Sequence, residues 1–199
     1  MKFLIYKFLK KINFFYFKFK TYLSYDFKIS KKNIKLEQEL IFQNEGLDRK
    51  KGEDKILSII HDNPDLNNNL KSEHQILFSS ISEKKKCPKI LEIGTYDGKN
   101  ALLLNKLFPE SKIFTIDLDE NDSNFSNTYQ RSNVNEKIKF CKERDDRLKN
   151  NKNIIFKKLN SINIKNLNQT FDLIWIDGAH GYPMVTIDII NSSSIIKED

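Results

Sequence analysis

Cysteine, glycine and proline are scarce in this sequence of 199 residues, which has two, six and four of them respectively. Cys87 and Cys141 lie far apart and without the spacing of metal ligands. They therefore exclude a disulfide framework and indicate reduced thiols in the cytoplasm. With 39% apolar residues the chain is not a disordered protein, and it can bury one sizeable core.

A long hydrophobic run is also missing from the N-terminal segment. It reads "MKFLIYKFLKKINFFYFKFKTYLSYDFK". A membrane span needs about 20 consecutive apolar residues, and lysines divide this segment into much shorter stretches. No small-residue cleavage site of a signal peptide follows. Lys7, Lys11 and Lys18 share one helical face. Residues 1–30 therefore either contact a membrane surface as an amphipathic segment or pack against the following domain or a neighbouring subunit.

Acidic residues are nearly absent from the same segment. Residues 1–32 hold nine lysines and one acid, Asp26, whereas the whole chain has a net charge of +7. The excess positive charge thus belongs to the N-terminal segment, and the rest of the chain is close to neutral. Nucleic acid is therefore not an expected partner of the remaining domain.

The remainder of the chain alternates short apolar runs with helical patterns. Residues 33–69 are polar except for a short helix expected at 56–60, and they end in the linker-like "HDNPDLNNN", so we place a domain boundary after residue 69. Ser72 and Gln75 have the spacing of a capping box, which predicts a helix over residues 70–84.

Four buried strands are predicted beyond that helix. They are "KILEIG" at 89–94, "KIFTID" at 112–117, "NIIFKKL" at 153–159 and "FDLIWID" at 171–177. Helices are expected at 101–108, where Pro109 ends the pattern, and at 136–149, with a polar loop over 121–135. Alternating strands and helices predict an α/β fold with a Rossmann-like parallel sheet over residues 70–199.

A glycine turn follows the first predicted strand. Residues 92–98 read E-x-G-x-x-x-G, and the G-x-G-x-x-G spacing of a dinucleotide site is absent, because Tyr96 and Lys99 stand where its later glycines would be. This disfavours a nicotinamide-dependent oxidoreductase, which we keep as a rival interpretation. Asp117 ends the second strand, where a carboxylate can accept hydrogen bonds from both ribose hydroxyls. The pattern predicts a nucleoside site without a pyrophosphate.

A second cluster of polar residues follows the fourth strand in "DLIWIDGAH". Asp177 and Gly178 could form only a turn, but ligands of parallel sheets bind beyond the carboxyl ends of the strands, where Asp177 and His180 would lie. A carboxylate suits a hard cation such as Mg²⁺, and a neutral imidazole can accept a proton from a hydroxyl group.

Three segments together resemble the class I S-adenosylmethionine-dependent methyltransferases, and especially the branch with sugar O-methyltransferases and cephalosporin-hydroxylase-like proteins. They are "ILEIGTYDGKNALLL", "IFTIDLD" and "FDLIWIDGAHGYPMVTIDI". The resemblance implies that the methionine part of the cofactor contacts Glu92, Gly94, Thr95 and Gly98. It also implies that Asp117 holds the ribose and that Asn160 and Ser161 lie at the adenine.

The same resemblance implies a catalytic end of the site, where Asp177 binds a divalent cation such as Mg²⁺, as in the metal-using members of the branch, and His180 is the base. In that family the chain continues through a fifth strand and an acidic pair that completes the metal site, whereas this sequence stops at Asp199. We therefore expect an incomplete sheet, in a fragment or in a truncated and inactive product.

We thus expect a cytoplasmic enzyme that methylates a hydroxyl group of a small molecule or saccharide. A non-catalytic or regulatory remnant of the same fold is the alternative. The acceptor and the oligomeric state are not indicated by these residues.

Overall fold

The computed structural model describes residues 31–66, 72–129 and 133–198, with the side chains of residues 31–33 left aside. The chain divides into two compact units, Met1–Gly46 and Leu47–Asp199. In the first unit the structure describes helix α2, Lys31–Asn44. The amphipathic segment expected at residues 1–30 lies outside the described residues. Within the described ranges, no helix combines the length and the apolar character needed to cross a membrane.

The second unit is built on a parallel sheet of four described strands, as the sequence predicted. Its strands are β1 (Lys89–Ile93), β2 (Lys112–Asp117), β3 (Ile154–Lys158) and β4 (Leu173–Ile176), in the spatial order β3-β2-β1-β4. Ile90 of β1 pairs with Ile113 of β2 on one side and with Leu173 of β4 on the other. The carboxyl ends of β1, β2 and β4 therefore meet at one edge of the sheet.

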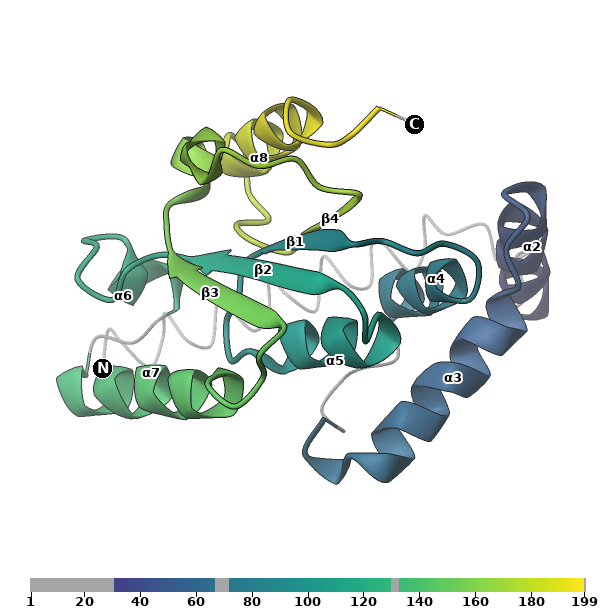
Figure 1. Ribbon diagram of the computed structural model, residues 1–199, viewed down its shortest axis with the longest axis horizontal. Helices are drawn as coiled ribbons and strands as arrows, with labels where there is room; N and C mark the ends of the chain where they lie inside the picture. The colour runs from purple at the N-terminus through teal and green to yellow at the C-terminus, as the bar shows by residue number, and fades with distance from the viewer. Residues whose placement is uncertain (1–30, 67–71, 130–132, 199) are drawn as a thin grey trace, which may run out of the picture. The chain divides into compact units, whose positions relative to one another are not determined.

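Helices cover both faces of this sheet (Figure 1). Helices α5 (Lys99–Leu107) and α7 (Val134–Leu148) lie on one face, and the 3₁₀ segment η2 (Ser161–Leu167) and helix α8 (Met184–Ser193) lie on the other. Neighbouring residues of a strand point to opposite faces, so both faces of β1 are apolar and Ile90 and Leu91 are both fully buried. Leu91 belongs to the core between the sheet and η2.

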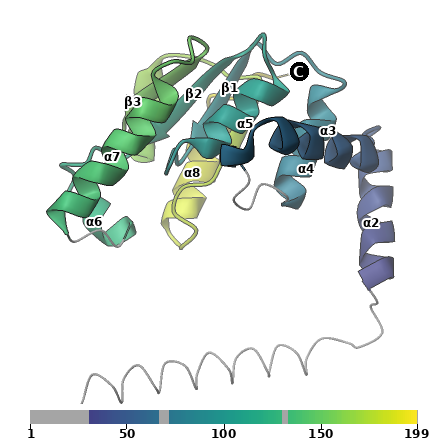
Figure 2. The same cartoon turned by 90° about the horizontal axis from the view of Figure 1, so that it is seen from below.

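Two further helices precede the sheet. Helix α3 (Arg49–Asp62) is much longer than the segment predicted at 56–60, because Asp48 caps it and accepts a hydrogen bond from the backbone N–H of Lys51. A 3₁₀ turn, η1 (Pro64–Leu66), follows it. Helix α4 (Glu73–Ser82) begins with the predicted capping box, in which the side chain of Ser72 and that of Gln75 each accept a backbone hydrogen bond. Figure 2 shows the same elements from below.

Two predictions from the sequence concern the loop at residues 121–135 and the domain boundary after residue 69. The polar loop expected over residues 121–135 contains a single turn of helix, α6 (Phe125–Thr128), because Phe125 is fully buried and fixes the turn against the domain. The boundary after residue 69 stays a prediction of the domain organisation. In the structure the second unit begins at Leu47, since α3 packs on α4 with Gly52 directly against Ser80.

Candidate functional site

A pocket of about 580 Å³ lies at the carboxyl ends of β1, β2 and β4. This volume is in the range of small-molecule sites, roughly 300 to 1,000 Å³. The pocket is formed by the connections that follow β1, β2, β3 and β4 and by the first turns of α8. Ligands of open α/β sheets bind at this edge, where the strand order changes direction.

The connection from β1 to α5 forms the floor of the pocket through Gly94. Its φ of +100° lies in the left-handed region, and a Cβ atom at this position would lie 2.2 Å from the carbonyl oxygen of Asp177. A larger residue would therefore be strained and would collide with the turn after β4. Tyr96, two residues further, also has a positive φ, of 48°, and its backbone N–H points toward β2.

Asp117, the last residue of β2, is a buried carboxylate at the centre of this edge. Oδ2 accepts a hydrogen bond from the backbone N–H of Tyr96, and Oδ1 accepts one from the backbone N–H of Leu118, both at 2.7 Å. Burial raises the pKa of Asp117, and its hydrogen bonds oppose that rise. These bonds fix the orientation of the carboxylate toward the pocket.

An aromatic group covers one side of Asp117. The Tyr129 hydroxyl donates a hydrogen bond of 2.5 Å to Oδ1 of Asp117, and the Tyr129 ring packs against Tyr96, Phe125 and Phe140. Burial and the neighbouring Asp117 carboxylate raise the pKa of Tyr129, so the phenol is the donor.

The turn after β4 carries the second polar group. The backbone N–H of Asp177 donates to the carbonyl oxygen of Ile93, which ties the turn to the end of β1. Nε2 of His180 lies 3.5 Å from Oδ1 of Asp177, and the side chains are 81% and 47% exposed. The imidazole is therefore open to a molecule that enters the pocket.

Two residues after β3 also reach the pocket. Asn160 and Ser161 both line it. Oδ1 of Asn160 accepts a hydrogen bond from the backbone N–H of Ile162 and so caps the start of η2. The backbone N–H of Leu159 donates to the carbonyl oxygen of Asp117, which keeps this connection beside the end of β2.

The structure thus gathers six of the nine predicted site residues around one pocket and leaves three next to it. The lining includes Gly94, Asp117, Asn160, Ser161, Asp177 and His180. Glu92, Thr95 and Gly98 are buried and are not among the lining residues, so direct contacts of these three residues with a ligand stay predictions.

Glu92 instead belongs to a buried network under the α5 face of the sheet. It is fully buried and accepts hydrogen bonds from Nδ2 of Asn100 at 2.7 Å and from Oγ1 of Thr115 at 2.5 Å. Oγ1 of Thr95 lies 2.6 Å from Oγ1 of Thr115. Burial raises the pKa of Glu92 to about 8, although both hydrogen bonds oppose the rise.

Asp177 and His180 do not make a magnesium site by themselves. Within residues 31–66, 72–129 and 133–198, no group of three or more His, Cys, Asp or Glu side chains is arranged to hold a metal ion. Mg²⁺ requires nearly octahedral oxygen coordination and is held by carboxylates together with water or substrate. The described donor set does not meet that requirement, so no chemical step is assigned to a metal here.

Sequence reasoning missed two residues of the site. Tyr129 stands in a segment that the sequence predicted to be a loop, and its contact with Asp117 depends on the fold of α6. Asp188 lines the pocket from α8. Its sequence signal is a single acid inside the apolar run "MVTIDII", where a charged residue is unexpected unless it serves a buried site.

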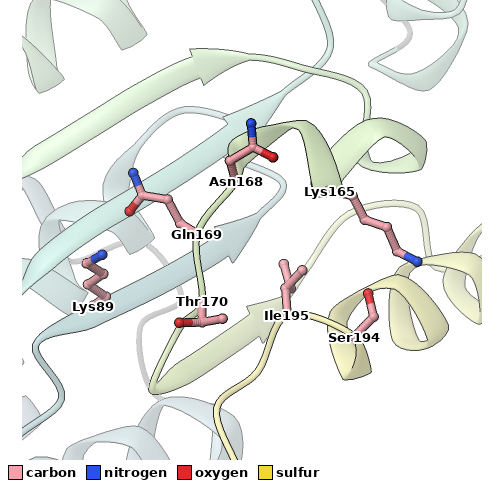
Figure 3. A pocket seen from close by; sticks show the side chains of 7 residues that line it. All are labelled: Lys89, Lys165, Asn168, Gln169, Thr170, Ser194 and Ile195. Carbon is pink, nitrogen blue, oxygen red and sulfur yellow. The ribbon is translucent and has the colours of Figure 1, made fainter.

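A second pocket, of about 510 Å³, lies near the amino ends of β1 and β4 (Figure 3). Its lining is formed mostly by exposed polar side chains, among them Lys165, Asn168 and Thr170. It borders the place where Phe171 and Ile196 form an isolated parallel bridge. Its position away from the carboxyl ends of the strands makes it the weaker candidate for a catalytic site.

Comparisons with known proteins give the family of the chain. A family model described as a methyltransferase domain matches residues 91–199, more than half of the chain. A search of curated protein sequences found no match.

Solved structures with a similar fold include two methyltransferases. One is the SAH-bound methyltransferase PaMTH1 of Podospora anserina, with 20% identity, a TM-score of 0.44, and coverage of 67% of this chain and 51% of the other. The second is the O-methyltransferase TomG of Streptomyces achromogenes in complex with SAM, with 16% identity, a TM-score of 0.46, and coverage of 80% and 66%. This chain thus spans about half to two thirds of the length of these structures.

Proposed function

Because the chain belongs to the family of methyltransferase domains, we propose that it transfers a methyl group from S-adenosylmethionine to a hydroxyl group of a small molecule or saccharide. S-adenosylmethionine, when bound, supplies an electrophilic methyl group on its sulfonium centre. The contribution of the chain is to bind, to orient and to accept a proton. Each of these tasks can be matched to residues of the first pocket.

The observation that carries the proposal is the buried carboxylate of Asp117 at the end of β2. Its two oxygens are oriented by the backbone N–H groups of Tyr96 and Leu118 and face the pocket. A fixed carboxylate at this position is suited to accept hydrogen bonds from the two hydroxyls of a ribose. Gly94 lines the pocket beside it, and because it has no Cβ the turn that carries Asp177 can lie directly against the end of β1.

The order of the strands gives the ligand a direction. Neighbouring strands lie about 4.8 Å apart, so the end of β2 and the end of β4 are separated by about 10 Å across β1. A nucleoside held at Asp117 would therefore direct its remaining part over Gly94 toward the turn at Asp177 and His180. The exposed side chains of Asp177 and His180 would then stand at the reacting end of the ligand.

His180 is the candidate base at that end. A hydroxyl oxygen becomes a better nucleophile as its proton is removed, and a neutral imidazole within reach can accept that proton. Asp177, 3.5 Å from Nε2 of His180, would stabilise the imidazolium that forms. Most of the remaining rate enhancement would come from holding the two reactants in line. Magnesium stays outside this proposal, because the described residues bring no third ligand to Asp177 and His180.

The test is methyl transfer from labelled S-adenosylmethionine to a panel of hydroxyl acceptors by the chain and by His180→Ala. The variant should bind the cofactor normally and lose activity by roughly a hundred- to ten-thousand-fold, the range for a general base. His61→Ala is a matched control, because His61 is also exposed and lies 3.2 Å from a neighbouring carboxylate, that of Asp62, but does not line the pocket. Full activity of His180→Ala would remove the base from the proposal.

A further inference from the structure

Asp188 is a buried carboxylate that none of the roles above uses. It is 1% exposed, it lines the first pocket, and its Oδ1 has no hydrogen-bond partner among the residues that the structure describes. Met184, one helical turn earlier on α8, lines the pocket as well. Residues four apart share one face of a helix, so the pocket-facing side of α8 presents Met184 and Asp188 together.

The turn after β4 leaves room for this carboxylate. A Cβ atom at Gly178 would lie 3.1 Å from Oδ2 of Asp188, closer than side chains normally approach. Glycine at this position therefore allows the carboxylate to reach the end of β4 next to Asp177. The carboxylate is thus placed at the side of the pocket opposite to Asp117, two strands away.

The lining of the pocket offers Asp188 no positive partner. It contains three aspartates, Asp117, Asp177 and Asp188, and among the described lining residues it contains neither lysine nor arginine. A buried carboxylate oxygen without a partner is costly, and the cost is recovered only when a cation or hydrogen-bond donor reaches it. A pocket of this composition therefore favours a ligand that carries positive charge.

We propose that the Asp188 carboxylate receives the α-ammonium group of the methionine part of the cofactor. The assignment rests on the function proposed above, in which the ribose lies at Asp117 and the amino-acid end extends across β1 toward β4. The α-ammonium group is a compact donor of three hydrogen bonds, which suits an oxygen that is buried and without a partner. The α-carboxylate of the same ligand would be repelled by Asp188 and would therefore point away from it.

The experiment compares two ligands that share the nucleoside and differ in the amino-acid part. Isothermal titration would measure S-adenosylhomocysteine, which has the ammonium group, and 5′-methylthioadenosine, which lacks it. Asp188→Asn should lower the affinity for S-adenosylhomocysteine by about ten- to a hundred-fold, the effect of losing a hydrogen bond to a charged group. It should leave the affinity for 5′-methylthioadenosine unchanged, which also demonstrates that the variant is folded.

Ser192→Ala is the matched control. Ser192 lies one turn after Asp188 on α8, it is buried with an Oγ that also has no hydrogen-bond partner in the described part of the chain, and it does not line the pocket. This variant should leave both affinities unchanged. Equal weakening of both ligands by Asp188→Asn, or no weakening of either, would overturn the proposal for Asp188.

A measurement on the unaltered chain covers the case in which Asp188→Asn does not fold. N-acetyl-S-adenosylhomocysteine, whose nitrogen has no positive charge, should bind at least about tenfold more weakly than S-adenosylhomocysteine. Equal affinities would overturn the proposal. If the unaltered chain binds neither S-adenosylhomocysteine nor 5′-methylthioadenosine, the proposed function itself fails, which is a different result from binding of both with no effect at Asp188.

Discussion

The hydroxyl of Tyr129 donates a hydrogen bond to Oδ1 of Asp117, the same oxygen that accepts the backbone N–H of Leu118. A carboxylate oxygen has two lone pairs in its plane, so Oδ1 is fully used, whereas Oδ2 accepts only the N–H of Tyr96. A ribose with two hydroxyls needs an acceptor position on each oxygen. Tyr129 therefore occupies one of the two positions that a ribose would take.

This relationship predicts that Tyr129→Phe binds S-adenosylhomocysteine more tightly than the unaltered chain. The variant has no hydroxyl that must be displaced from Asp117, and a hydrogen bond to a charged group contributes about 1.5 to 3 kcal/mol. Part of this is recovered when the displaced phenol finds water, so we expect an increase in affinity of about three- to thirty-fold by calorimetry.

Tyr182→Phe is the control for loss of a phenol, because Tyr182 is exposed and does not line the pocket. The affinity of Tyr182→Phe for S-adenosylhomocysteine should match that of the unaltered chain. Weaker binding by Tyr129→Phe would mean that the hydroxyl supports the ligand, and the competition inferred here would be wrong.

Glu92 predicts a specific dependence of stability on pH. The pKa of Glu92 is about 8 in the folded chain and about 4.5 in the unfolded chain. Between these two pH values the folded chain therefore holds one more proton than the unfolded chain. The free energy of unfolding must then fall as the pH rises through this window. Glu92→Gln resembles the protonated acid, because its Oε1 can accept from Nδ2 of Asn100 while its Nε2 donates to Oγ1 of Thr115, and it therefore removes this dependence.

Chemical denaturation at pH 5 and pH 8 would measure the effect. Relative to Glu92→Gln, the unaltered chain should lose on the order of 3 kcal/mol of unfolding free energy between the two pH values. Glu110→Gln, at an exposed glutamate, should follow the unaltered chain. Parallel pH dependence of the Glu92→Gln and unaltered chains would contradict the raised pKa.

Removal of divalent cations should leave cofactor binding unchanged. The residues proposed for the nucleoside are Asp117 and its neighbours, and the described residues contain no cluster of three metal ligands. Affinity for S-adenosylhomocysteine with a chelator and with added magnesium chloride should therefore agree within about twofold. A loss of affinity on chelation would mean that Asp177 has further ligands.

The fold was predictable where the pattern of apolar residues was strong. The strand expected at residues 112–117 matches β2, because a buried parallel strand is apolar on both faces and is bounded by polar residues. The fragment around Phe125 was not predictable in the same way, since one buried aromatic residue in a polar segment gives no periodic signal. Its turn of helix depends on the packing of Phe125 with Phe140 and Cys141 of α7, a contact that no local pattern of apolar residues indicates.

The site was predictable at the ends of strands and less so elsewhere. Asp117 and Asp177 end predicted strands and His180 stands three residues after the second, and the topology of a parallel sheet brings such residues to one edge. Asp188 lies on α8 and Tyr129 directly follows α6, and their approach to the same edge is set by the packing of these two helices. Glu92 was expected at the ligand; in the structure it accepts a hydrogen bond from Asn100 of α5, and its contact with a ligand stays a prediction.

The binding of S-adenosylhomocysteine to the unaltered chain and to Asp117→Ala tests the central claim most directly. Calorimetry should detect binding to the unaltered chain, a loss of about ten- to a hundred-fold in Asp117→Ala, and no binding of NAD to either. Absence of S-adenosylhomocysteine binding, equal affinity of the two chains, or binding of NAD in its place would contradict a methyltransferase site at the end of β2.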